Sequence, residues 1–414
     1  MAAVVISVIH VSKENLKGPF DLDGRTVPLI SAFLFHSGGN ENPAILNVNK
    51  NQSFQGSVVV GLGFTFDDAD EKGMANSLAE MHQLLRNSPL NSEAIFPYIG
   101  GEELNDSPTL SHHRYIINFG DISENDARNA WPDLMAIVER KVKPERLKRG
   151  VGGSPDRVKR AEKWWQFSRF AKELYDAIKD VDRVLVCSQT SKYLEFAFLP
   201  INYVFSNKLV VINKRSWAAF SILQSQMHQY WADFMGSSMK DDPVYTPSDC
   251  FETFPFPKDF ESNPALEKAG QEYYEYRATL MVQNNEGLTK TYNRFHDPDE
   301  TSPEIHRLRE LHAAMDRAVL DAYGWTDIPT NCDFILDYDD KDEEVSSRRK
   351  KPWRYRWPDE VRDDVLAKLL ALNAERAEEE RLAGLADMAQ GSPKKRGKKK
   401  NSAVISEDGS FTLT

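Results

Sequence analysis

Residues 182–212 read DRVLVCSQTSKYLEFAFLPINYVFSNKLVVI, and residues 213–236 continue with NKRSWAAFSILQSQMHQYWADFMG. Short apolar runs predict three strands, at residues 183–187, 194–198 and 209–212. Ser216 stands at an N-cap position, and the apolar residues after it recur at helical spacing as far as Phe234. Gly236 is well placed to end that helix. The stretch therefore predicts a buried α/β core in which one long helix packs on three strands.

Composition sets the limits for the rest of the chain. Its 414 residues can form two or three domains, and 41% of them are hydrophobic, which is typical of a globular protein. No run approaches the ~18 apolar residues of a membrane span, and residues 2–11 lack the basic start of a signal peptide. The three cysteines, Cys187, Cys250 and Cys332, form no CxxC pair. We therefore expect a cytoplasmic protein with no membrane partner, no zinc site and no disulfide framework.

The net charge of −11 argues against nucleic acid, but the charge is unevenly distributed. Residues 139–172 hold twelve basic and four acidic residues, a local charge of +8. Such a run is either a solvated helical face or a phosphate-binding surface. Trp164, Trp165 and Phe167 lie inside it, and they are either core residues or a surface on which bases stack.

The segments before the central stretch contain further strand patterns. Residues 4–11 and SAFLFH at 31–36 predict two strands, which need a larger sheet to join. SVVVGLGFTFDD at 57–68 contains Gly61-x-Gly63, the beginning of a nucleotide-binding loop. A dinucleotide fingerprint would need a third glycine opening a helix, and Phe66 stands there instead. We interpret this segment as a glycine-bearing strand or hairpin.

Helical spacing of apolar residues predicts helices at residues 75–86, 134–142, 163–179, 266–282, 304–323 and 361–385. Residues 116–119 predict a strand, and Ser123 with Asp126 resembles a capping box that opens a short helix. Residues 146–156 have the composition of a basic, glycine-containing linker. From residue 390 the tail, with KKRGKKK at 394–400, is of low complexity and is predicted to be disordered.

Several long phrases carry a family resemblance. They are SAFLFHSGG (31–39), SFQGSVVVGLGFTFDD (53–68), IFPYIGGEELNDSPTLSHHRYIINFGD (95–121), RVLVCSQTSKYLEFAFLP (183–200), YWADFMGSSMKDD (230–242) and YTPSDCFETFPFP (245–257). In this order they resemble the MmeI-like and Eco57I-like adenine-specific DNA methyltransferases of prokaryotic restriction-modification and phage-defence systems. The resemblance covers the chain from about Val4 to Trp325.

The resemblance implies a fold and a domain organisation. It implies an α/β (α+β) protein with terminal strands of a Rossmann-like methyltransferase sheet, a mixed α/β target-recognition domain and a helical C-terminal region. The expected segments are a catalytic-domain remnant (1–56), the target-recognition domain (57–258), the helical region (259–335), a charged segment and helix (336–389) and a basic tail (390–414).

The implied partner is double-stranded DNA. Phosphates are expected to be met by the basic segment from Arg140 to Arg169, in which Arg146, Lys148, Arg149, Lys163 and Arg169 are the individual DNA-binding candidates. Polar side chains on the inserts of the recognition region are the candidates for reading bases, namely Arg114, Gln189, Lys192, Lys208, Lys214, Arg215 and Lys240. Arginine and lysine can pair with guanine, and glutamine with adenine, in the major groove.

Catalytic motifs are absent from the sequence. The family grips a flipped adenine with an Asn/Asp-Pro-Pro-aromatic motif, and this chain has no Pro-Pro dipeptide and no convincing S-adenosylmethionine loop. We therefore expect no catalytic residue and no cofactor bound by this chain, although S-adenosylmethionine would serve the intact family enzyme. The chain is predicted to be the C-terminal portion of a methyltransferase whose upstream half is absent or separately encoded.

Two alternatives remain open at this stage. The chain could be a free-standing DNA-specificity subunit that assembles with a separate methyltransferase chain. A weaker alternative is a helical ribonuclease or interaction protein, because Arg307 and His312 match the loose Arg-x4-His pattern of some helical ribonucleases.

Overall fold

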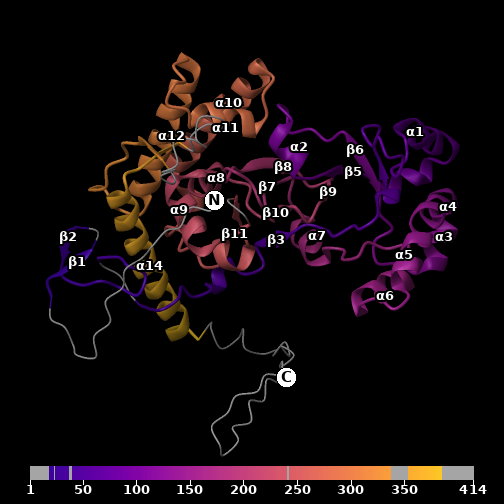
Figure 1. The fold of residues 1–414 in the computed structure, drawn as a ribbon, viewed down its shortest axis with the longest axis horizontal. Helices are drawn as coiled ribbons and strands as arrows, with labels where there is room; N and C mark the ends of the chain where they lie inside the picture. The colour runs from indigo at the N-terminus through magenta and orange to yellow at the C-terminus, as the bar shows by residue number, and fades with distance from the viewer. Residues whose placement is uncertain (1–17, 23, 37–39, 240–241, 337–352, 385–414) are drawn as a thin grey trace, which may run out of the picture.

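The computed structural model describes residues 18–22, 24–36, 40–239, 242–336 and 353–384. They form a larger body and a smaller lobe joined by a narrow waist (Figure 1). We define the small lobe as residues 57–98 and 112–170. The mixed α/β class predicted from the sequence is confirmed, and so is a helical C-terminal region. No helix of these residues is long and apolar enough to cross a membrane.

The body is built on an antiparallel sheet in the order β3-β10-β7-β8. Its strands are β3 (Ser53–Gln55), β10 (Leu209–Ile212), β7 (Arg183–Ser188) and β8 (Ala197–Pro200). Two of the three predicted strands therefore lie where expected, but the third begins at Ala197 instead of Leu194. The reason is that side chains occupy the backbone groups of Phe196. Its N–H donates to Gln224 Oε1 (3.1 Å), and its carbonyl accepts from Arg277 Nη2 (2.6 Å).

The prediction of a single helix after Ser216 is wrong, because the chain forms two helices there. Helix α8 (Trp217–Gln224) and helix α9 (Gln226–Met235) are separated by Ser225 in an extended conformation. Ser225 Oγ accepts from the N–H of His228 and donates to the carbonyl of Ile222. Both predicted ends are confirmed, since Ser216 caps α8 and Gly236 follows α9.

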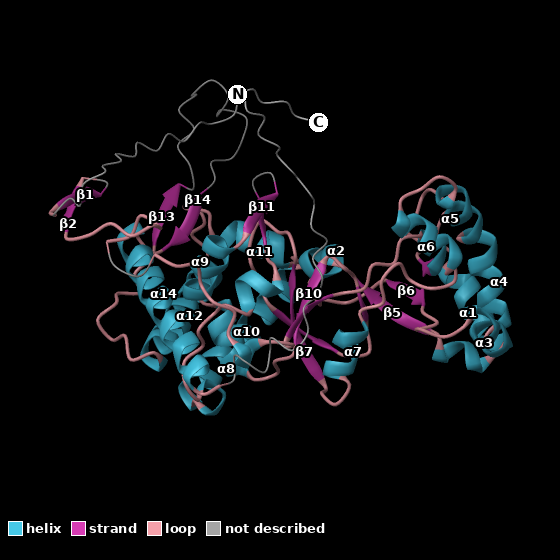
Figure 2. Cartoon of the chain, turned by 90° about the horizontal axis from the view of Figure 1, so that it is seen from below, coloured by secondary structure: helices cyan, strands magenta, loops and turns pink. Residues whose placement is uncertain are grey.

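The C-terminal helices pack around this sheet and around α8 and α9, with α14 (Asp359–Leu382) against α9 (Figure 2). They are α10 (Pro264–Asn284), α11 (Leu288–Phe295), α12 (Pro303–Ala322) and α14, of which α11 was not predicted. A short hairpin of β13 (Asp333–Leu336) and β14 (Trp353–Arg356) was not predicted either. Val210 of the sheet, Tyr273 of α10 and Met315 of α12 lie in one hydrophobic core, which is therefore continuous across residue 258.

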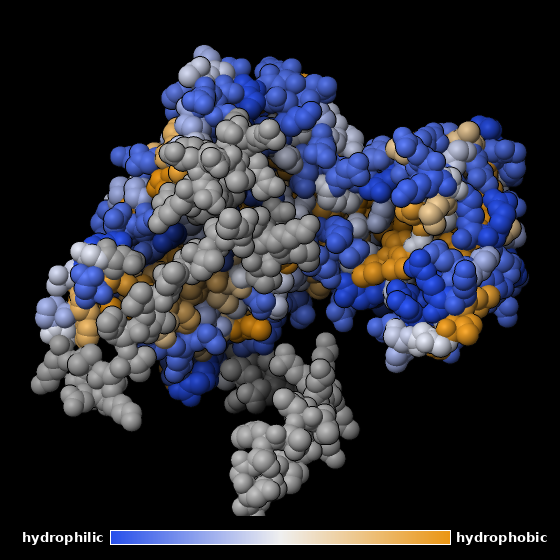
Figure 3. Space-filling view, viewed as in Figure 1, coloured by the Kyte–Doolittle hydropathy of each residue, from blue (hydrophilic) through white to orange (hydrophobic). Residues whose placement is uncertain are grey.

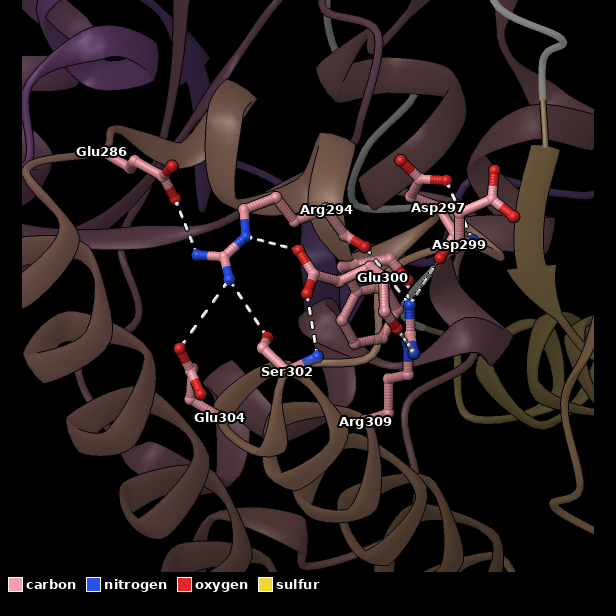
Figure 4. A network of polar contacts seen from close by, with 9 residues as sticks. Glu286, Arg294, Asp297, Asp299, Glu300, Ser302, Glu304 and Arg309 are labelled. Atoms are coloured by element: carbon pink, nitrogen blue, oxygen red, sulfur yellow. Dashed lines mark hydrogen bonds and ion pairs between the residues drawn. The ribbon is translucent and has the colours of Figure 1, made fainter.

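Two arginines hold the α11–α12 connection together (Figure 4). Arg294 extends toward Glu286 (3.3 Å) and Glu300 (2.7 Å). Arg309 of α12 instead donates to backbone carbonyls, among them those of Phe295 (3.0 Å) and Asp297 (2.9 Å). The hydrogen bonds from Arg294 lower the pKa of Glu300 to about 2.

The small lobe has its own sheet, in the order β4-β6-β5-β9. Its strands are β4 (Thr65–Phe66), β6 (Arg114–Ile117), β5 (Ile95–Ile99) and β9 (Val204–Phe205). Strand β9 pairs with β5 in parallel and directly precedes β10 of the body. The waist is therefore made by strands of both regions. Helix α2 (Gly101–Asp106) and helix α7 (Lys172–Ile178) also lie at the waist (Figure 1).

Five helices surround the sheet of the small lobe: α1 (Leu78–Asn87), α3 (Glu124–Ala130), α4 (Pro132–Lys141), α5 (Lys143–Gly150) and α6 (Pro155–Glu162). Its core includes Phe64, Ile116, Leu134, Val138 and Trp164. The predicted linker at 146–156 is wrong, because α5 extends to Gly150 and α6 begins at Pro155. The helix predicted at 163–179 is present only as α7.

The first described segments differ from the expected strands. Residues 31–36 form a turn, in which Ser31 Oγ accepts from the N–H groups of Phe33 and Phe35, so the predicted strand is wrong. A hairpin of β1 (Phe20–Leu22) and β2 (Arg25–Val27) precedes it. The predicted strand at 4–11 and the predicted disordered tail lie outside the described residues.

Candidate nucleic-acid interface

Three predicted DNA contacts converge beside the turn between β9 and β10. The N–H of Gln189 donates to the carbonyl of Lys208 (2.8 Å). Gln55 bridges this turn to Arg169, because its Nε2 donates to the carbonyl of Asn207 (2.9 Å) and its Oε1 accepts from Arg169 Nη2 (2.7 Å). The side chains of Lys208 and Arg169 are exposed, and Gln189 is half-buried. The fold thus brings together three polar residues that are far apart in the sequence.

Arg114 lies at the waist and is tied to a buried carboxylate. Its Nε and Nη2 donate to Glu103 Oε1 (2.5 Å) and Oε2 (2.7 Å), and Glu103 also accepts from the N–H of Gly100 (2.9 Å). Burial acts to raise the pKa of Glu103, but the hydrogen bonds and charge of Arg114 outweigh it and lower the pKa. Only 17% of the Arg114 side chain is exposed. Its main role in this structure is to hold the start of α2.

Cations of the small lobe lie on α5, on α6 and just after α6. Lys148, Arg149 and Lys163 are exposed, as predicted for a charged surface. Arg149 is paired with Glu145 of its own helix (2.7 Å). The ammonium groups of Lys148 and Lys163 have no side-chain partner among the residues that the structure describes. They are free to meet phosphates.

Arg146 is the exception in the basic segment, because it is 5% exposed. Its Nη2 donates to the carbonyls of Val59 (2.8 Å) and Val60 (2.7 Å), and its Nη1 donates to those of Trp164 (3.2 Å) and Gln166. Burial, and next the charge of Arg160, lower its pKa to about 10. The group is therefore still cationic at neutral pH. The exposed position expected for Arg146 is wrong, since it joins α5 to the loop at Val59 and Val60 and to the turn that follows α6.

The remaining candidates do not lie on the same surface. Lys214 and Arg215 follow β10, whereas Lys208 precedes it, so the two groups lie at opposite ends of the sheet. Lys214 Nζ is paired with Glu261 (2.6 Å), and its side chain is 16% exposed. Lys192 Nζ donates to Asn293 Oδ1 of α11 (2.8 Å). Lys240 lies outside the described residues.

Sequence reasoning singled out none of the arginines of α6. Arg157 and Arg160 stand in the basic segment and line a cavity together with Arg146 and Arg149. The high local charge was visible in the sequence, but the spacing of the residues did not show which cations would lie together.

The aromatic residues of the basic segment differ in burial. Trp164 and Phe167 are core residues, whereas Trp165 is half-buried and donates Nε1–H to the carbonyl of Ile122 (3.0 Å).

The structure gives no support to the ribonuclease alternative. Arg307 is 55% exposed and paired with Glu310, whereas His312 is buried and paired with Asp316 (3.2 Å). The two side chains of the motif therefore do not share a site.

Gly63 has a packing role, because a Cβ there would lie 2.6 Å from the Cβ of Lys141. Among the described residues, no group of His, Cys, Asp and Glu could hold a metal ion.

The fold and the exposed cations define a mixed α/β recognition module with a basic surface. Residues 47–258, just over half of the chain, match the family model described as MmeI, target recognition domain. The chain belongs to this family, and the resemblance seen in the sequence is confirmed. No curated protein matches the chain.

A solved structure has a similar fold, with a TM-score of 0.53 and 18% sequence identity. It is described as the type IIL restriction-modification enzyme MmeI in complex with DNA. The likeness covers 86% of this chain but 39% of that one, so the chain spans well under half of the length of MmeI. At this identity the comparison concerns the fold.

Proposed function

We propose that this chain recognises a specific sequence of double-stranded DNA as the target-recognition part of a restriction-modification or phage-defence methyltransferase that modifies adenine. The observation that carries the proposal is the match of residues 47–258 to the target recognition domain of MmeI. The described complex of MmeI with DNA and the exposed cations of this chain support the same partner.

Two groups of residues are proposed to contact DNA, one at its phosphates and the other at its base edges. Lys148 and Lys163 meet phosphates, which gives affinity without sequence information. At the β9–β10 turn, Gln189 and Lys208 are proposed to read base edges with an amide and an ammonium group. Glutamine pairs with adenine and lysine with guanine in the major groove.

The first experiment measures the salt dependence of duplex binding by fluorescence anisotropy. Neutralising the two lysines proposed to meet phosphates, with Lys148→Gln and Lys163→Gln, should flatten the slope of log K against log salt by about 2, because each phosphate contact contributes ~0.9. The control neutralises two exposed cations of the body, Lys268 and Arg307, and should leave the slope unchanged. Equal slopes for the wild type and the first variant would contradict the proposal.

Methyl transfer is proposed to depend on a portion that this sequence does not contain. The absence of a Pro-Pro motif supports this division, because nothing in the sequence matches the motif with which the family grips a flipped adenine. By calorimetry the chain should release no heat with S-adenosylmethionine. Radioactive methyl groups should reach adenine only after a catalytic portion is added, fused or as a second chain. Labelling by the purified chain alone would contradict this division.

A further inference from the structure

The small lobe contains a cavity of about 290 Å³ between α5, α6 and the loop that precedes β4. It is lined by Val60, Gly61, Leu62, Met74, Glu145, Arg146, Arg149, Arg157 and Arg160. The lining therefore combines four arginines with one glutamate and several apolar residues. Arginines gathered in this way favour an anion with several acceptor oxygens.

The carboxylate does not neutralise the site. Glu145 is paired with Arg149 at 2.7 Å, which leaves three positive charges. Arg160 donates Nε–H to the carbonyl of Asp156 in its own helix (3.0 Å). The guanidinium of Arg157 has no hydrogen bond or ion pair with any residue that the structure describes. The donors of α6 are thus available to a ligand.

Arg146 adds an independent observation at the base of the cavity. Its side chain is 5% exposed, and its Nε is buried without a hydrogen-bond partner. Its other nitrogens donate to backbone carbonyls, so no carboxylate is bonded to this buried cation. A buried charge without a counter-ion is costly, and an anion bound in the cavity would reduce that cost.

The apolar wall indicates what the anion is attached to. Val60, Leu62 and Met74 are 38%, 42% and 43% exposed, and apolar side chains gather on this lobe among hydrophilic ones (Figure 3). Val60 has a φ of 54°, which a β-branched residue rarely adopts, and Gly61 follows with a φ of 135°. Arg146 holds the loop in this strained conformation. Such strain is maintained at binding sites more often than elsewhere.

We propose that this cavity binds a phosphodiester of duplex DNA, with Arg149, Arg157 and Arg160 on the phosphate oxygens and Leu62 and Met74 against the adjoining deoxyribose. The apolar wall favours DNA over a free inorganic anion, because only the sugar offers C–H groups to cover these side chains. This inference rests on the proposed function and assigns it a defined phosphate site, separate from Lys148 and Lys163.

The first test removes the two arginines of α6 with Arg157→Gln and Arg160→Gln. The slope of log K against log salt should fall by about 2, equally for target and non-target duplexes, so affinity should vary ~12-fold less between 50 and 200 mM salt. The matched control, Lys268→Gln with Arg307→Gln, should behave as the wild type. If the wild type binds DNA and the arginine variant keeps its slope, the cavity proposal is overturned while the proposed function stands. Without DNA binding by the wild type, both fail.

The second test places opposite charges at one exposed position, so that misfolding cannot imitate the result. Leu62→Glu should weaken duplex binding at least tenfold, whereas Leu62→Lys should retain it or tighten it. Equal effects of the two substitutions would overturn the proposal. In a third arm, inorganic phosphate is titrated while the arginine side chains are observed by NMR. If phosphate binds and duplex DNA does not displace it, the cavity is a site for a free anion. That result would also overturn the proposal.

Discussion

Helices of the body and helices of the small lobe differ in what they bury. In α8 of the body, seven residues of the eight are buried, from Ala218 to Gln224. In α5 the only buried residue is Arg146, and α6 buries none. The hydrophobic effect therefore holds the body helix in place, whereas α5 and α6 are attached through a few specific contacts. That arrangement leaves several of their cations exposed to solvent, among them Lys148 and Arg157.

Close contacts replace burial in the α5–α6 pair. A Cβ on Gly150 would lie 2.6 Å from the Cβ of Ala161, and one on Gly153 would lie 2.5 Å from the carbonyl oxygen of Arg149. Glycines thus allow the two helices to approach each other. Arg146 then joins the pair to the lobe through backbone carbonyls. We therefore expect truncation of a buried apolar side chain to destabilise the body most. In the small lobe, loss of the buried cation Arg146 should be the destabilising change.

The largest effect is expected for Trp231→Ala in the body. Trp231 is fully buried, and its Nε1 donates to Thr253 Oγ1 (3.0 Å). The free energy of unfolding, measured by urea denaturation, should fall by about 3–5 kcal/mol, as for other buried large aromatics. Trp231→Phe keeps most of the volume and should cost less. A loss below ~1 kcal/mol would show that α9 is not part of the core.

A somewhat smaller effect is expected for Arg146→Met in the small lobe. The substitution keeps an apolar stem but leaves the carbonyls of Val60, Trp164 and Gln166 without their donor. Unsatisfied buried acceptors cost about 1–3 kcal/mol each, and we expect a total near 3 kcal/mol because some can be rehydrated. Hydrogen exchange should rise in the small lobe before it rises in the body. The exposed neighbour provides the control, since Lys148→Met should change stability by less than ~0.5 kcal/mol.

The smallest change in stability is expected at the N-cap serines of two helices. Ser225 accepts from the N–H of His228 at the start of α9, whereas Ser154 makes no side-chain capping bond at the start of α6. Ser225→Ala should therefore lower the free energy of unfolding by about 1 kcal/mol, and Ser154→Ala should leave it almost unchanged. Thermal unfolding of the two variants measures the difference. Equal losses would mean that the body and lobe helices are not held differently at their ends.

Sequence patterns predicted the elements that depend on near neighbours. Strands β7 and β10 and helices α10, α12 and α14 lie close to the expected residues, because apolar spacing and terminal signals are local. Helix α11 was missed, because it is short and lies in a polar stretch. The extent of β8 was also missed, since Gln224 and Arg277, which bond the backbone of Phe196, are distant in the sequence.

The sequence by itself determined the family, the α/β class and the segment in which positive charge is concentrated, because long phrases and local composition carry that information. Only the tertiary structure decided how each cation is used. It buries Arg146, pairs Lys214 with Glu261, and gathers Arg157 and Arg160 around a cavity. It also places Lys208 and Arg215 at opposite ends of one sheet. The physical reason is that burial and charge pairing depend on partners that are distant along the chain.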